Sequence, residues 1–370
     1  MSTTVDAPPG GLRTDLGAAE PKKVLPIRGW AMFGAAMVAI QAWAFTHWIV
    51  TGLATPTPTG PDEVPTWMQY SIWAFQGICV VVGAFAIYWY FIRVWRRGEK
   101  IGFDSYMVLG MYLTFWQDPL LNYFQKWATY NAGLVNFGSW TSSIPGWLSP
   151  DAHYMPEPLL FVVPTYGIVC FLMAVVGNLF MRRMRERHPT WSNPRLLLAT
   201  LGFFIVFGGA VEMAWMRLGI YAYPGAIKSL TLFAGHYYQY PLYEMFFFAA
   251  TFTAWSAMRF FRNDRGETVT ERGLEELRIK KPPRQVGVIR GLAVIGACNA
   301  AMLFIYNAPL QLFAMHSEPW PDDILNRSYL VDQFCGEGTT YACSGTDTPI
   351  PRRGGLHVTP DGQLVDADDE

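Results

Sequence analysis

Three carboxylates interrupt apolar stretches of this sequence, where an ionisable side chain is costly and is therefore a candidate for function. Asp118 lies in FWQDPLLNYFQKW, Glu212 in GGAVEMAW and Glu244 in LTLFAGHYYQYPLYE. A carboxyl group desolvated among apolar side chains is suited to general acid catalysis. We expect the three to share one cavity. For Glu212 an ion pair with Arg217 is an equally good interpretation.

Asp118 is followed by Pro119, which removes a backbone donor and leaves the carbonyl of Phe115 without its helical partner. Asn122 and Gln125 follow at helical spacing, so they are expected on the same helix face as Asp118. The pattern favours a polar site at a helix kink. The alternative is a kink whose polar side chains only satisfy local backbone groups.

The stretch of residues 230–244 combines a histidine with tyrosines and a carboxylate. His236, Tyr240 and Tyr243 recur at helical spacing, with Gln239 on the same side. Such a set is suited to an acid–base relay, in which His236 hydrogen-bonds Asp118 or Glu212. An aromatic belt at a membrane interface is the alternative, and it accounts better for the tyrosines.

These patterns define two sets of candidate residues. The candidate catalytic residues are Asp118, Glu244, His236 and Glu212. The candidate substrate-binding residues are Asn122, Tyr123, Gln239, Tyr240, Tyr243 and Trp116.

The elements that position these residues are predicted to be membrane helices. The chain has 370 residues, 51% hydrophobic and only 15% charged, against about 25% charged in ordinary soluble domains. We predict an all-α, integral membrane bundle of about seven helices, each near the ~20 residues that cross a bilayer. The predicted spans are 27–50, 67–92, 105–130, 158–181, 196–216, 236–261 and 287–314.

The charged residues between the spans predict the orientation. Arginine and lysine gather in 92–104, 182–195 and 259–290, whereas 51–66 and 131–157 contain neither. Because cytoplasmic loops retain basic residues, we expect a cytoplasmic N-terminus and an extracytoplasmic C-terminus. The domain prediction is a disordered tail over 1–25, a transmembrane domain over 26–316 and an irregular acidic tail over 317–370. A disulfide between Cys335 and Cys343 and two free thiols are equally compatible with the sequence.

Several chemistries lack their motifs. The sequence contains no H-x-x-x-H, C-x-x-C or H-E-x-x-H spacing, no phosphate-binding glycine loop, and no D-D-x-x-D arrangement. We therefore predict that neither metal nor cofactor is used, and that the partners are the lipid bilayer and an apolar small molecule, with no nucleic acid. The sequence does not indicate an oligomeric state.

Four segments, taken together, resemble the AveC-like spirocyclase family of actinobacteria. They are IRGWAMFGA at 27–35, DPLLNY at 118–123, IPGW at 144–147 and LTLFAGHYYQYPLYE at 230–244. The resemblance implies a membrane enzyme of secondary metabolism that closes a spiroketal on a polyketide and, in the type member, also dehydrates the product. A membrane terpene or carotenoid-type cyclase is the alternative activity, and a lipid-binding or transport protein without chemistry is a second alternative.

Overall fold

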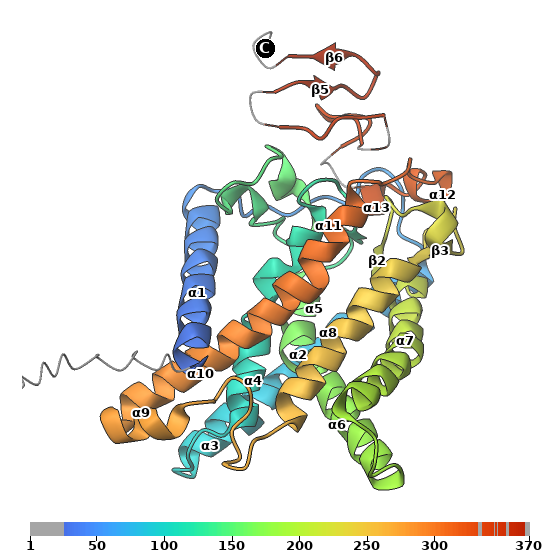
Figure 1. Cartoon of the computed structure of the whole chain (residues 1–370). Coiled ribbons are helices and arrows are strands. Elements are labelled where there is room, and N and C mark those ends of the chain that lie inside the picture. The colour runs from blue at the N-terminus through green and yellow to red at the C-terminus, as the bar shows by residue number, and fades with distance from the viewer. Residues whose placement is uncertain (1–25, 332–334, 344, 346, 353–354, 367–370) are drawn as a thin grey trace, which may run out of the picture.

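A computed structural model describes residues 26–331, 335–343, 345, 347–352 and 355–366 (Figure 1). The predicted disordered tail over 1–25 lies outside the described residues. Most of the described chain is helical, and the helices run side by side between two loop-rich ends. The mainly helical fold class predicted from the sequence is therefore confirmed.

The longest helices are assembled from α-helical pieces joined by short π-helical segments. α2 and α3, α5 and α6, and α10 and α11 are joined through Tyr88–Ile92, Thr165–Val169 and Met302–Asn307, respectively. The α-helices are α1 Pro26–Val50, α2 Thr66–Ile87, α3 Arg93–Arg96, α4 Phe103–Tyr112, α5 Leu159–Pro164, α6 Cys170–Arg187, α7 Asn193–Arg217, α8 Leu242–Phe260, α9 Leu274–Lys280, α10 Pro283–Ala301, α11 Ala308–Ala314, α12 Asp322–Leu325 and α13 Ser328–Val331.

Short 3-10 helices and two-residue strands make up the rest of the regular structure. The 3-10 helices are Phe115–Asn122, Thr141–Ser143, Ala152–Tyr154 and Lys228–Leu230. The antiparallel strand pairs are β1 Thr129–Tyr130 with β2 Tyr221–Ala222, β3 Thr231–Leu232 with β4 Tyr240–Pro241, and β5 His357–Val358 with β6 Leu364–Val365.

Within the described residues, five continuous helices are long and apolar enough to cross a membrane. They are Pro26–Val50, Thr66–Arg96, Leu159–Arg187, Asn193–Arg217 and Pro283–Ala314. These five coincide with predicted spans, so the membrane character of the chain is consistent with the structure. The other two predicted spans have a different form.

The predicted span 105–130 is not one continuous α-helix. α4 ends at Tyr112, and a 3-10 helix that contains Pro119 follows over Phe115–Asn122. The chain then turns, because the Asn122 side-chain oxygen accepts the backbone N–H groups of Trp127 and Ala128 at 2.8 Å each. A polar side chain thus replaces the helical partners that proline and the turn remove.

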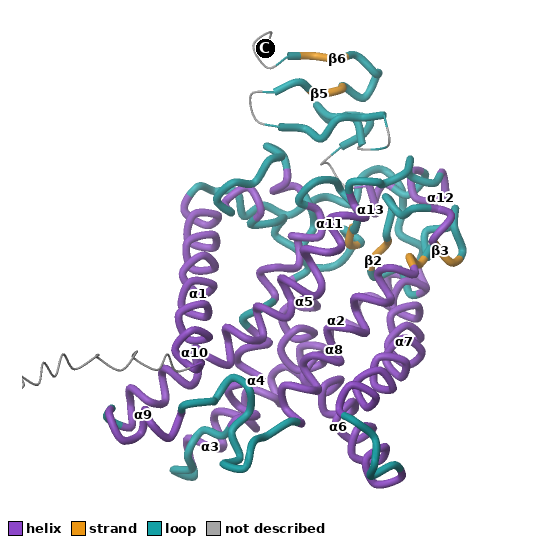
Figure 2. Tube along the Cα trace, viewed as in Figure 1, coloured by secondary structure: helices purple, strands orange, loops and turns teal. Residues whose placement is uncertain are grey.

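The predicted span 236–261 begins later than the sequence suggested. α8 starts at Leu242, after Pro241, and residues 233–241 form a loop and strand β4 (Figure 2). Phe233 and Gly235 have φ angles of 55° and 91°, which are incompatible with a right-handed helix. The helical spacing predicted for His236, Tyr240 and Tyr243 is therefore wrong.

Close backbone contact holds α1 against α10. A Cβ atom on Gly34 would lie 2.0 Å from the Leu292 carbonyl oxygen, and one on Gly296 would lie 2.1 Å from that of Trp30. Only glycine fits at this crossing, as at many helix crossings in membranes.

The two ends of the bundle differ in charge. α3, α9 and the last turns of α6 lie at one end, together with the arginine-rich loops. The opposite end carries the 131–157 loop, the short strands β1–β4, α12, α13 and the described C-terminal residues. In that C-terminal region Cys335 and Cys343 form a disulfide, which decides between the two alternatives left by the sequence.

Candidate active site

A cavity lies inside the bundle between the 3-10 helix Phe115–Asn122 and helices α5 to α8. The empty space within it totals about 1030 Å³, part of it open to solvent. Its wall is largely apolar, and the polar groups in it are mostly carboxyls and tyrosine hydroxyls. The acidic and phenolic lining residues are Asp118, Glu157, Glu212, Tyr130, Tyr166, Tyr221, Tyr223 and Tyr306.

Glu212, on α7, is surrounded by three tyrosine hydroxyls. Tyr221 and Tyr223 donate to its Oε1 at 2.9 and 2.7 Å, and Tyr240 donates to its Oε2 at 2.6 Å. Gly219, with a φ angle of 74°, turns the chain after α7 so that β2 returns beside that helix. The ion pair with Arg217 that the sequence left open is not formed, since the Arg217 guanidinium lies 3.6 Å from the Tyr238 ring instead.

The tyrosines around Glu212 remain donors at neutral pH. Burial raises the pKa of the Tyr221, Tyr223 and Tyr240 hydroxyls well above its usual value, and the negative charge of Glu212 adds to the effect. Three neutral phenols therefore stabilise one carboxylate in a place where solvent cannot.

Glu244 lies beside Glu212 and is fully buried in the first turn of α8. Tyr306 donates to its Oε1 at 2.7 Å, and the two carboxyl groups interact electrostatically. Its carboxyl group also contacts the side chains of Glu212 and Tyr240. Glu244 is not among the described residues that line the cavity, and it contacts the lining through Tyr306 and Glu212. The expectation that the three carboxylates line one cavity therefore holds for Asp118 and Glu212 but not for Glu244.

A second acidic pair lies across the cavity. Asp118, on the 3-10 helix, accepts a 2.6 Å hydrogen bond from the Tyr166 hydroxyl. The side chains of Glu157 and Tyr130 also interact with its carboxyl group. Asp118 and Glu157 are 5% and 2% exposed, so both carboxyls are removed from bulk water.

The two acidic pairs belong to one polar network. Tyr130, next to Asp118, also interacts electrostatically with Glu212, and Tyr306, bound to Glu244, interacts with Asp118. No lysine, arginine or histidine occurs among the described residues that line the cavity. The network therefore brings two pairs of carboxyl groups together beside a lining that, among the described residues, has no basic side chain. Within the described residues, no group of three or more potential ligands is placed to hold a metal ion.

His236 does not belong to this network. Its side chain is 54% exposed, its Nδ1 lies 3.8 Å from Asp323 Oδ2, and its ring stacks on Tyr238. The predicted hydrogen bond from His236 to Asp118 or Glu212 is therefore wrong. The reason is the loop before α8, which directs this side chain towards α12 and away from the cavity.

The predicted substrate-binding residues divide into two groups. Asn122 lines the cavity, and Tyr240 and Gln239 lie behind it, Gln239 donating to the Tyr223 carbonyl oxygen at 2.7 Å. The second group is Tyr243, Tyr123 and Trp116, which are not among the described residues that line the cavity. The Tyr243 hydroxyl accepts from Trp127, the Tyr123 hydroxyl donates to the Gly146 carbonyl, and the Trp116 indole donates to Asn299.

Sequence reasoning missed several residues of the network. Glu157, Tyr130, Tyr166, Tyr223 and Tyr306 are not among the candidates that the sequence indicates. Glu157 follows Pro156 in a segment with no helical or strand periodicity, so its burial left no local signal. For Tyr221 and Tyr223 a signal existed, since their alternation after Gly219 is typical of a short strand with one buried face.

Comparison with known proteins shows a match to one protein family. Residues 95–330 match a protein family described as spirocyclase AveC-like. No curated protein and no solved structure matches the chain. The match spans the 3-10 helix, both acidic pairs and every tyrosine of the network, and it covers most of the chain. The chain belongs to the AveC-like spirocyclase family, as the sequence resemblance predicted.

Proposed function

We propose that the cavity is the catalytic centre of a membrane-embedded, cofactor-free cyclase or dehydratase. Family membership indicates a cyclase-type enzyme of secondary metabolism. The reaction we propose is closure of a spiroketal, or a related ring, on an apolar polyketide-like metabolite. The observation that carries the proposal is the placement of Asp118, Glu157 and Glu212 in the wall of one cavity, with Glu244 buried beside Glu212. Among the described residues, the lining of this cavity contains no basic side chain.

A site with several carboxyl groups can both donate and accept a proton, which suits ring closure by loss of water. A protonated carboxyl gives its proton to the hydroxyl of a hemiketal, which leaves as water and forms an oxocarbenium ion. A second substrate hydroxyl then adds to that carbon and gives its proton to a carboxylate. One proton is given and one is taken, so the site is reset by transfer between its own carboxyls.

The hydrogen bonds of the network suggest which carboxyl group is the base and which are the acids. Glu212, held by three phenol donors, is the better carboxylate and therefore our candidate base. Glu244 and Asp118 are the candidate acids, because each accepts a tyrosine hydroxyl at no more than 2.7 Å and lies near a second carboxyl. Asp118 lines the cavity itself, whereas Glu244 would exchange its proton with the cavity through Glu212. Dehydration at a neighbouring carbon would use the same groups.

The apolar wall suits both the substrate and the charged intermediate. Trp215, Phe252 and Trp255 line the cavity, and aromatic faces attract a developing positive charge. Exclusion of bulk water protects an oxocarbenium ion from capture by solvent. The arginine-rich end is, in this proposal, cytoplasmic, so the chain begins inside the cell and ends outside.

Metabolite profiles of the parent strain, a deletion strain and the complemented deletion strain test this proposal. A spirocyclase or dehydratase predicts a precursor in the deletion strain that is heavier than the lost product by one water. A terpene-type cyclase predicts a lost product of the same mass as its precursor. Redistribution of an unchanged compound between cells and medium would indicate transport, and either of these last two results contradicts the proposal.

A further inference from the structure

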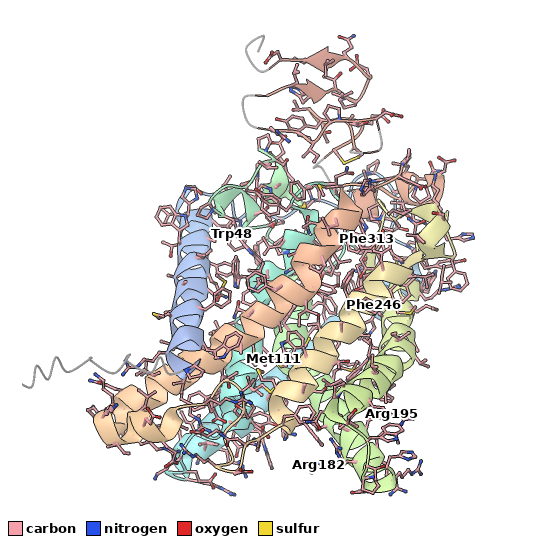
Figure 3. All side chains as sticks on the ribbon, in the orientation of Figure 1. Trp48, Met111, Arg182, Arg195, Phe246 and Phe313 are labelled. Carbon is pink, nitrogen blue, oxygen red and sulfur yellow. A yellow bond between two sulfur atoms is a disulfide. The ribbon has the colours of Figure 1, made fainter. Side chains whose placement is uncertain are left out.

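A second hollow lies at the opposite end of the bundle from the disulfide. Four arginines line it together with Asp104 and Asn178, and they come from three different helices and the chain after α8. The arginines are Arg182, Arg259, Arg262 and Arg290. Figure 3 labels Arg182 at this end, where α6 reaches its last turns. We refer to this hollow as the arginine groove.

Two guanidinium groups of the groove are held in fixed positions. Arg259 donates to both carboxylate oxygens of Asp104 at 2.9 and 2.7 Å and to Asn178 Oδ1 at 2.7 Å. Arg290 Nε donates to Glu271 Oε1 at 2.6 Å. A guanidinium carries five N–H donors, so both arginines keep donors for a further ligand.

The other two arginines provide the uncompensated charge. Among the described residues no carboxylate pairs with Arg182 or Arg262, and both side chains are exposed. Arg262 donates to the Gly266 carbonyl oxygen at 3.0 Å and lies over the Phe103 ring. The groove therefore combines two positioned guanidinium groups with two positive charges that no carboxylate of the described residues neutralises, an arrangement that matches a phosphate group.

The surroundings of the groove indicate where such a phosphate would come from. Trp89 and Trp95 precede the start of α4, which forms one wall, and are 42% and 80% exposed. Exposed tryptophans next to arginine-rich loops are typical of the interface where lipid headgroups lie. We propose that the arginine groove binds a phosphate group, and that the headgroup of an anionic phospholipid is its source.

Binding to the full-length protein in detergent micelles tests the assignment. The dissociation constant is measured for phosphatidylglycerol, for phosphatidylcholine, which has no net charge, and for inorganic phosphate. We expect phosphatidylglycerol to bind more tightly than phosphatidylcholine. The double variant Arg182→Gln/Arg262→Gln should weaken that binding about tenfold or more, because each substitution removes a charge-assisted contact.

A matched control separates a site from general attraction. Arg183→Gln/Arg187→Gln removes the same charge from exposed positions of α6 that do not line the groove. It should leave phosphatidylglycerol binding within about twofold of the parent protein. Equal weakening by both double variants, or no binding of either anion, overturns the proposal. Inorganic phosphate that binds only when Arg182 and Arg262 are present, without lipid binding, would keep the phosphate site but overturn its lipid source.

Discussion

The three phenols around Glu212 allow one substitution to be analysed in detail. In Glu212→Gln, the amide can offer its oxygen either to Tyr221 and Tyr223 or to Tyr240. The orientation that keeps two hydrogen bonds, those from Tyr221 and Tyr223, is favoured over the one that keeps only the bond from Tyr240. The amide nitrogen then faces the Tyr240 hydroxyl, whose proton loses its acceptor in a fully buried place. A buried polar group without its partner costs about 1–3 kcal/mol, and we expect destabilisation of that size.

A second substitution should reverse this loss. Tyr240→Phe removes the hydroxyl that lacks an acceptor, so Glu212→Gln/Tyr240→Phe should recover most of the stability lost in Glu212→Gln. Turnover should not recover, because the candidate base is still missing, and we expect it to stay about 10²–10⁴-fold below the parent. Unfolding is followed by tryptophan fluorescence in mixed micelles, and turnover by complementation of the deletion strain.

Two results would refute this reasoning in different ways. If the two substitutions destabilise additively, the hydroxyl network around Glu212 does not set the cost. If the double variant restores turnover along with stability, Glu212 is a structural acceptor and the catalytic assignment fails.

Three further predictions concern the acids, the histidine and the orientation. Asp118→Asn and Glu244→Gln should each lower turnover by about 10²–10⁴-fold while leaving folded protein in the membrane, and near-normal product levels in both complemented strains would make these carboxyls structural. His236→Phe should leave turnover unchanged, since this side chain faces Asp323 and is largely exposed; a large fall in product at equal protein level would contradict that placement. A cysteine introduced at Glu63 should react with an impermeant thiol reagent added to intact cells, whereas one at Arg97 should not, and reaction at Arg97 would invert the proposed topology.

Much of the helical architecture follows from local properties of the chain. Five of the predicted spans coincide with helices long and apolar enough to cross a membrane, because hydropathy over ~20 residues needs no knowledge of distant neighbours. The two spans that differ are 105–130 and 236–261, which contain Pro119 and Pro241. Around Pro119, Asn307 and Gln311 donate to the backbone carbonyls of Gln117 and Leu120, and before Pro241 strand β4 pairs with β3. These hydrogen bonds with other segments outweigh the local preference for a helix.

The sequence by itself determined the family, the helical fold class and the carboxylates most costly to bury. It did so because motif order, apolar periodicity and a charge inside an apolar run are all local features. Only the tertiary structure decided the partners of those carboxylates. Glu157 joins Asp118, and Tyr306 joins Glu244, across separations that no periodicity encodes. His236 is excluded for the same reason: the turn at Phe233 and Gly235, set by packing against α7 and α12, directs its ring to Asp323.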